Sequence, residues 1–154
     1  GPQVMKGYWQ RPEETDKVIT DDGWLRTGDV AMMTEDGFFK IVDRKKDMII
    51  SGGFNVYPRE VEDVLTAHPD VAMAAVIGVP DVKWGEKVLA VVVLRPGADI
   101  EPGDLIYLVR EKNGAIQAPK QLEFAEQLPL TALGKTDKKV LRQRYWPDSG
   151  RRVN

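Results

Sequence analysis

The chain has 154 residues, of which 22 are Lys or Arg and 24 are Asp or Glu, and its formal net charge is −2. This length is typical of one ordinary domain, and the near balance of charge argues against a general polyanion binder, which would carry a basic excess. The absence of Cys and the single His, His68, exclude disulfides, thiolate zinc sites, cysteine nucleophiles and multi-histidine metal sites, although counting alone leaves a Ser–His pair open.

Residues 1–44 carry many turn signals and few residues that could close a core. Strand-like segments at 30–33 and 38–42 flank the turn at 35–37, a pattern typical of a β-hairpin. We therefore expect residues 1–44 to be the β-rich edge of a larger domain.

Residues 45–146 are predicted to form a small two-layer α+β domain. A helix is expected over 58–68, because Val61 and Leu65 lie on one face at helical spacing. The other expected elements are strands at 48–51, 71–79, 87–94 and 120–125 and helices at 102–112 and 137–145. This alternation predicts a three-stranded sheet with helices plus a β-hairpin, followed by a disordered tail at 147–154.

Polar residues at two places suggest a nucleotide site. Asp29 follows a Thr-Gly turn, which can hold its carboxylate so that it accepts two hydrogen bonds from a vicinal diol such as a ribose. An Asx-turn that only closes a loop explains the same residues. Arg44 can donate several hydrogen bonds to a phosphate or a sugar, whereas Lys46 fits a solvated hinge. Because a run of charges is also typical of a solvated surface, these residues alone leave both interpretations open.

A glycine turn and a lone lysine are the other candidates. Glycines at Gly52 and Gly53 permit a positive φ or the close approach of a ligand, but their spacing matches neither a Walker loop nor a dinucleotide fingerprint. Lys135 ends the loop-like stretch 129–135 just before an expected helix, where its ammonium could bridge two oxygen groups that gain negative charge. A simple turn and an ordinary surface lysine remain the alternatives.

Four segments, in their order along the chain, resemble motifs at the C-terminal end of the adenylate-forming enzymes, which include acyl-CoA synthetases, luciferases and peptide-synthetase adenylation domains. They are Gly1–Pro12, Trp24–Asp29, Asp43–Glu60 and Pro129–Lys135, and together they extend over nearly the whole chain. The run Asp43–Pro58 is most similar to fatty-acyl and aryl acyl-CoA ligases.

The resemblance implies a two-step reaction that uses ATP and coenzyme A. A carboxylate attacks the α-phosphate of Mg-ATP to give an acyl-adenylate and pyrophosphate, and the thiol of coenzyme A then displaces AMP to form a thioester. A small C-terminal domain is implied to rotate about a hinge between the two steps. Mg²⁺ is expected in the full enzyme, with its ligands outside this chain.

The resemblance also implies a role for each candidate residue. Asp29 matches the ribose-binding Asp, and Arg44 matches an Arg that reaches the ribose or the phosphates. Lys46 matches the hinge position. Gly53 matches a loop glycine beside the pantetheine channel of coenzyme A, where a side chain would block the thiol. Lys135 matches the catalytic Lys of the first step.

The chain departs from the family pattern in several places. Gln117 stands where a Lys can help to bind coenzyme A phosphates, which puts that contact in doubt. Lys138, Lys139 and Arg142 could meet the 3′-phosphate, although a solvated helix face also accounts for them. The family's phosphate loop, adenine motif, metal-binding Glu and acyl pocket all lie upstream of these motifs. The resemblance therefore predicts a C-terminal fragment that packs on its own N-terminal domain and is not catalytic alone.

Two other functions remain open from the sequence. The chain could be a non-catalytic interaction module, or it could belong to an adenylating enzyme outside coenzyme A chemistry, such as a luciferase-like or peptide-synthetase protein. The longest apolar runs, 71–79 and 88–94, are shorter than the roughly 20 residues of a membrane span. We expect a cytoplasmic protein with no nucleic-acid partner, with peripheral membrane association for a fatty-acid substrate.

Overall fold

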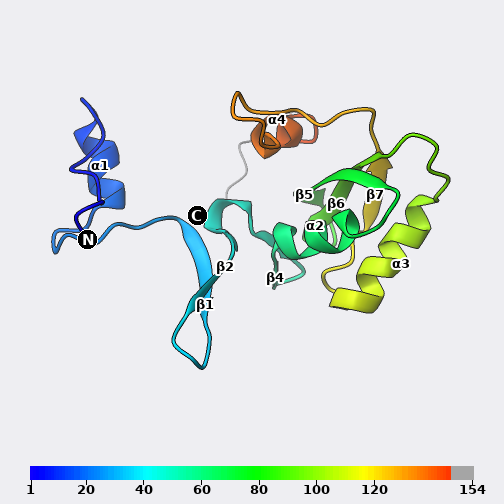
Figure 1. Ribbon diagram of the computed structural model, residues 1–154, viewed down its shortest axis with the longest axis horizontal. Helices are drawn as coiled ribbons and strands as arrows, with labels where there is room; N and C mark the ends of the chain where they lie inside the picture. Colours follow the sequence, from blue (N-terminus) through cyan, green and yellow to red (C-terminus); the bar gives the residue numbers. More distant parts are fainter. Residues whose placement is uncertain (147–154) are drawn as a thin grey trace.

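The computed structural model describes residues 1–146, and the tail expected at 147–154 lies outside the described residues. The N-terminal part consists of helix α1 (Pro12–Val18) and an antiparallel pair of strands, β1 (Asp29–Met33) and β2 (Phe39–Arg44). Figure 1 shows this part to one side of a larger α+β unit, residues 45–146. The short 3₁₀ helix η1 (Lys45–Asp47) follows β2 directly and connects the two.

One five-stranded sheet forms the centre of the α+β unit. Its strands are β3 (Ile49–Ser51), β4 (Phe54–Val56), β5 (Val71–Asp81), β6 (Gly85–Leu94) and β7 (Gln121–Phe124). The antiparallel pair β5–β6 is the longest, and β7 lies parallel to β6 on its other side. The expected three-stranded sheet is therefore β5, β6 and β7. The hairpin β3–β4 extends it through a single pairing, Ser51 with Gly85, and the α+β class is confirmed.

Helices cover both faces of the sheet. Helices α2 (Pro58–Thr66) and α3 (Pro102–Asn113) pack on one face and α4 (Lys138–Gln143) packs on the other, as Figure 1 shows. Because successive strand residues point to opposite faces, Val76 lies under α2 and α3 while Ile77 lies under α4. Each fully buried Leu or Val side chain contributes about 1.5–3 kcal/mol to the stability of the fold. Helix α4 adds a further layer to the two that the sequence predicted.

Three elements were not predicted from the sequence: α1, β4 and the short η1. Helix α1 has a proline in its first turn followed by two acidic residues, which is typical of a helix start. It buries no residue, so the apolar stripe that marks a helix is missing. Strand β4 is only three residues long and follows the two glycines of its turn. Over residues 1–146, no helix is both long enough and apolar enough to cross a lipid bilayer.

Candidate functional site

Three predicted site residues, Arg44, Lys46 and Lys135, line one open cleft of about 510 Å³. The cleft lies where η1 meets α2 and the loop before α4. Every side chain that lines this charged cleft is ionisable, and they are Asp43, Arg44, Lys46, Asp47, Arg59, Glu62, Asp63, Lys135 and Lys138. Five of these side chains are cations and four are carboxylates, so the lining carries only a small excess of positive charge.

Asp29 lies next to the charged cleft through its pairing with Arg44. The two residues are directly opposite each other on β1 and β2, and Arg44 Nε lies 2.9 Å from Asp29 Oδ1. Since a guanidinium has five N–H donors, this pairing leaves Arg44 with donors for a second acceptor. The structure therefore brings together the two residues that the resemblance assigns to a ribose.

Asp43 connects the end of β2 to the start of α2. It is buried, and its two carboxylate oxygens accept hydrogen bonds from the backbone N–H groups of Arg44 at 2.6 Å and Arg59 at 2.9 Å. A carboxylate at a helix N-terminus satisfies a free N–H group and is favoured by the helix dipole. The sequence analysis missed this role, because it treated residues 43–47 as one run of charges.

A tight turn presents Lys135 at the edge of the charged cleft. The backbone N–H of Thr131 donates to the carbonyl of Lys135 at 2.7 Å, and that of Gly134 donates to the carbonyl of Thr131 at 2.9 Å. Gly134 has a φ of 74°, a conformation that favours glycine. Asp137 then caps α4 by accepting two backbone N–H groups of its first turn. The Lys135 side chain is exposed, so it is free to reach a ligand.

Helix α4 is attached to the rest of the α+β unit by two ion pairs. Lys138 Nζ lies 2.7 Å from Glu62 Oε1, and Arg142 Nη1 lies 2.9 Å from Asp47 Oδ1. Burial raises the pKa of Glu62 above its usual value, while Lys138 acts in the opposite direction. The expectation of a solvated face is therefore wrong for Lys138 and Arg142, because both cations are held by partly buried carboxylates. It holds for Lys139, which is exposed.

Gly53 lies outside the charged cleft, in the two-residue turn between β3 and β4. Its φ is 84° and that of Gly52 is 58°, as the favoured two-residue hairpin turns require. A Cβ at Gly52 would lie 2.7 Å from Trp84 Cε3, whereas a Cβ at Gly53 would meet no atom within 4 Å. Gly53 therefore borders open space, and Gly52 packs against an indole ring.

The indole of Trp84, beside this glycine turn, is an aromatic surface that the sequence analysis missed. The ammonium of Lys83 lies 4.9 Å from the ring centroid and that of Lys120 lies 5.9 Å from it. Partial burial, together with the charge of Arg110, lowers the pKa of Lys120 below its usual value. The sequence offered one signal, an aromatic residue in the turn between two apolar runs.

Gln117, at a position where the family often has Lys, points toward α2. Its Nε2 donates to Glu60 Oε2 at 2.9 Å, and its Oε1 is buried without a hydrogen-bond partner among the described residues. The side chain is therefore engaged inside the α+β unit, in a hydrogen bond with α2.

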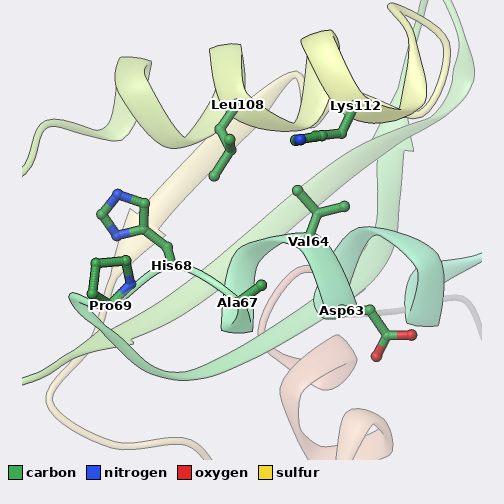
Figure 2. Close-up of a pocket in the computed structure, with 7 residues that line it drawn as sticks. All are labelled: Asp63, Val64, Ala67, His68, Pro69, Leu108 and Lys112. Carbon is green, nitrogen blue, oxygen red and sulfur yellow. The ribbon is translucent and has the colours of Figure 1, made fainter.

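An apolar groove of about 440 Å³ lies between α2 and α3, away from the predicted site residues (Figure 2). Val64 and Leu108 face each other across it, and His68 lies at one end. The Nδ1 of His68 accepts a hydrogen bond from the backbone N–H of Asp70 at 3.2 Å. No serine lines this groove, so it offers no support for a Ser–His pair.

The acidic side chains of the charged cleft do not form a metal site. Asp43 holds two backbone N–H groups, while Asp47 and Glu62 hold the two cations of α4. Among residues 1–146 there is no group of three or more His, Asp or Glu side chains that could hold a metal ion. The donor set therefore does not fit Mg²⁺ bound by this chain alone.

Comparison with known sequences identifies the family. Residues 60–135 match the family model described as AMP-binding enzyme C-terminal domain. The chain is 51% identical to the medium/long-chain-fatty-acid–CoA ligase FadD8 of Mycobacterium tuberculosis, with 99% of this chain and 28% of that protein covered. It is 50% identical to a feruloyl-CoA synthase of an Amycolatopsis species, with 94% of this chain and 29% of that protein covered. The chain thus spans less than a third of the length of these relatives.

Solved structures give the same result. The amide bond synthetase McbA from Marinactinospora thermotolerans matches with a TM-score of 0.86 at 48% identity, over 94% of this chain and 30% of that one. ATP-bound MatB from Rhodopseudomonas palustris matches with a TM-score of 0.86 at 43% identity, over 94% of this chain and 29% of that one. For apo MatB, with the same identity and coverage, the TM-score is 0.69. The chain belongs to the family of AMP-binding enzyme C-terminal domains, within the adenylate-forming superfamily.

Proposed function

We propose that the chain is the C-terminal part of an acid–CoA ligase, which makes an acyl-adenylate from a carboxylic acid and ATP and then a thioester with coenzyme A. The observation that carries this proposal is the separation of two sites. The charged cleft holds Arg44, Lys46 and Lys135, whereas Gly53 lies in an open turn beside Trp84. The fatty-acid ligase and the feruloyl-CoA synthase among its relatives support a fatty or aryl acid as the substrate.

The charged cleft fits the first step. Asp29 and Arg44 bind the ribose and the adjoining phosphate, since a paired carboxylate and guanidinium offer both acceptors and donors to such a group. Lys135 bridges the attacking carboxylate and the α-phosphate, where negative charge concentrates in the transition state. Mg²⁺ would be held by residues outside this chain and would supply charge neutralisation on the phosphates.

The second step needs a different face of the α+β unit. We assign residues 1–44 to the edge of a large domain, residues 45–146 to a mobile domain, and Lys46 in η1 to the hinge between them. The higher TM-score against ATP-bound MatB than against apo MatB supports an arrangement like that of the ATP-bound relative. Rotation about the hinge would then bring the Gly53 turn toward the reacting carbonyl.

The hairpin β1–β2 supports packing on a larger domain. Its exposed side chains include several large apolar ones, which a free surface rarely gathers in one place. They are Met32, Met33, Phe38, Phe39 and Ile41.

A cytoplasmic location, where ATP and coenzyme A are available, follows from the proposed reaction.

The function is tested with the full-length protein, Mg-ATP and a panel of fatty and aryl acids. We expect carboxylate-dependent exchange of pyrophosphate into ATP without coenzyme A, and equal amounts of AMP and acyl-CoA with it. Because one structural match is an amide bond synthetase, amines are supplied in parallel. Exchange with amide but no thioester would place the protein outside coenzyme A chemistry. The absence of exchange with every acid would favour a non-catalytic module.

Replacing Asp29 with alanine should raise the KM for ATP about tenfold to hundredfold, since a hydrogen bond to a charged group is worth about 1.5–3 kcal/mol. The measurement is pyrophosphate exchange at varied ATP. Asp36→Ala, which removes an exposed carboxylate in the turn between β1 and β2, is the matched control and should leave this KM unchanged. An unaltered KM for ATP in Asp29→Ala would contradict the ribose assignment.

Replacing Trp84 with alanine should raise the KM for coenzyme A about tenfold, because stacking of a base on an aromatic ring is worth about 1–3 kcal/mol. Trp84 lies beside the Gly53 turn, and two lysines lie near its ring. This arrangement suits an adenine ring and its phosphates. Tyr107→Ala, which removes an exposed ring on α3, serves as the control. Equal increases in the KM for ATP and for coenzyme A would argue against a nucleotide platform specific to the second step.

A further inference from the structure

Helix α4 begins three positions after Lys135 and is fixed by two cations one helical turn apart. Lys138 reaches Glu62 on α2 at 2.7 Å, and Arg142 reaches Asp47 on η1 at 2.9 Å. All four side chains are less than one-fifth exposed. Residues at i and i+4 lie on the same helix face, so both cations point into the α+β unit and join α4 to two different elements.

Other contacts of α4 and the residues after it restrict its movement further. Leu141 is fully buried against the sheet. The hydroxyl of Tyr145 donates to Glu123 Oε2 on β7 at 2.6 Å, and the indole N–H of Trp146 donates to the carbonyl of Gly78 on β5 at 3.0 Å. A helix of six residues is too short to be stable alone, so these tertiary contacts determine where it lies.

The position of α4 determines the position of Lys135 because only two residues separate Lys135 from the helix. The backbone N–H of Asp137 donates to the carbonyl of Pro129 at 2.7 Å, and the Asp137 side chain caps the helix. A rotation of α4 would therefore turn the whole 129–137 loop. Lys138 itself lines the charged cleft together with Lys135.

We propose that Lys138 and Arg142 are positioning residues for Lys135, which hold its turn over the charged cleft by clamping α4 to α2 and to η1. The inference rests on the proposed function, in which Lys135 acts in adenylation. Arg142 binds Asp47, the neighbour of Lys46, so the 129–137 loop and α4 are joined to the hinge segment itself. When the α+β unit rotates, Lys135 then moves with the hinge as one body.

A purely stabilising role predicts a different result. Exchanging a buried ion pair for uncharged residues of similar size is often neutral for stability, whereas removing one partner leaves an uncompensated buried charge. The informative variant is therefore Lys138→Met combined with Glu62→Gln, which removes the pair without leaving a charge unpaired. Arg142→Met combined with Asp47→Asn does the same for the second pair, and Lys139→Ala, on the exposed side of α4, is the control.

The experiment measures both half-reactions in the full-length protein, together with hydrogen exchange over residues 129–137. We expect each paired replacement to lower kcat for pyrophosphate exchange about tenfold or more, because a displacement of 1 Å can cost about 10²-fold in rate. The KM for ATP, the rate of thioester formation from supplied acyl-adenylate and the melting temperature should stay close to those of the parent protein. Hydrogen exchange should accelerate in the 129–137 loop and in α4, and not in the rest of the α+β unit.

The same paired replacements in a Lys135→Ala background show whether the clamp or the adenylation role of Lys135 is wrong. If the clamp acts through Lys135, they cause no further loss of pyrophosphate exchange there. A full additive loss, or unchanged exchange in the paired variants, would overturn the clamp while leaving the role of Lys135 intact. If both half-reactions and the melting temperature fall together, the pairs only stabilise the fold and the inference is wrong. If Lys135→Ala alone leaves adenylation intact, the proposed function fails first.

Discussion

Lys135→Ala in the full-length protein is expected to lower carboxylate-dependent pyrophosphate exchange about 10²–10³-fold, the usual loss when one preorganised donor to a developing anion is removed. The side chain is exposed at the end of a hydrogen-bonded turn and lines the cleft that also holds Arg44. Its removal takes one positive charge from the place where the carboxylate and the α-phosphate meet, without opening a cavity in the core.

The same variant should convert supplied acyl-adenylate and coenzyme A to thioester at nearly the parent rate. Lys139→Ala removes an equal charge from the exposed side of α4 and should change neither half-reaction. A loss of thioester formation as large as the loss of exchange would mean that Lys135 serves both steps, or that the variant is misfolded. A normal melting curve separates these two explanations.

Gly53→Leu is expected to lower thioester formation on the order of 10²-fold while leaving pyrophosphate exchange intact, because a small misplacement of reacting groups costs about this much. An added Cβ at Gly53 meets no atom within 4 Å. The new side chain therefore extends into open space beside Trp84, where the proposed path of the thiol runs. The left-handed φ of 84° adds strain of about 1–2 kcal/mol for any residue with a Cβ.

Gly97→Leu separates obstruction from strain. Gly97 has a φ of 81°, and a Cβ there also meets no atom within 4 Å, but it lies in the loop between β6 and α3. Both variants should show a similar drop in melting temperature, and only Gly53→Leu should lose thioester formation. If Gly97→Leu loses as much, backbone strain explains the effect and the channel assignment of Gly53 is wrong.

Most of the α+β unit was predictable because its elements carry strong local signals. The strands at 71–79 and 87–94 are apolar runs bounded by turn residues, and the structure extends them only by a few residues to β5 and β6. Helix α4 was expected over 137–145 and is shorter at both ends, because Asp137 forms its N-terminal cap and Arg144 its C-terminal cap. Helix α1 was missed because an exposed helix has no periodic apolar pattern.

The candidate site was predictable only where a motif marks it. Asp29, Arg44 and Lys135 were candidates from their local patterns and took their expected roles from the resemblance, and the register of β1 with β2 explains why the first two meet. The pair of Arg142 with Asp47 joins residues 95 positions apart, and no local pattern predicts such a contact. The environment of Trp84 was equally hidden, since the second of its two lysines comes from the distant position 120.

The most direct test of the account is one ratio, the rate of pyrophosphate exchange divided by the rate of thioester formation from supplied acyl-adenylate, measured on the same sample of each variant. Because both rates scale with the amount of folded protein, this ratio does not depend on partial misfolding. If the charged cleft serves the first step and the Gly53 turn serves the second, Lys135→Ala should lower this ratio about 10²–10³-fold. Gly53→Leu should raise it on the order of 10²-fold. Ratios equal to that of the parent protein in both variants would contradict this division of the two steps.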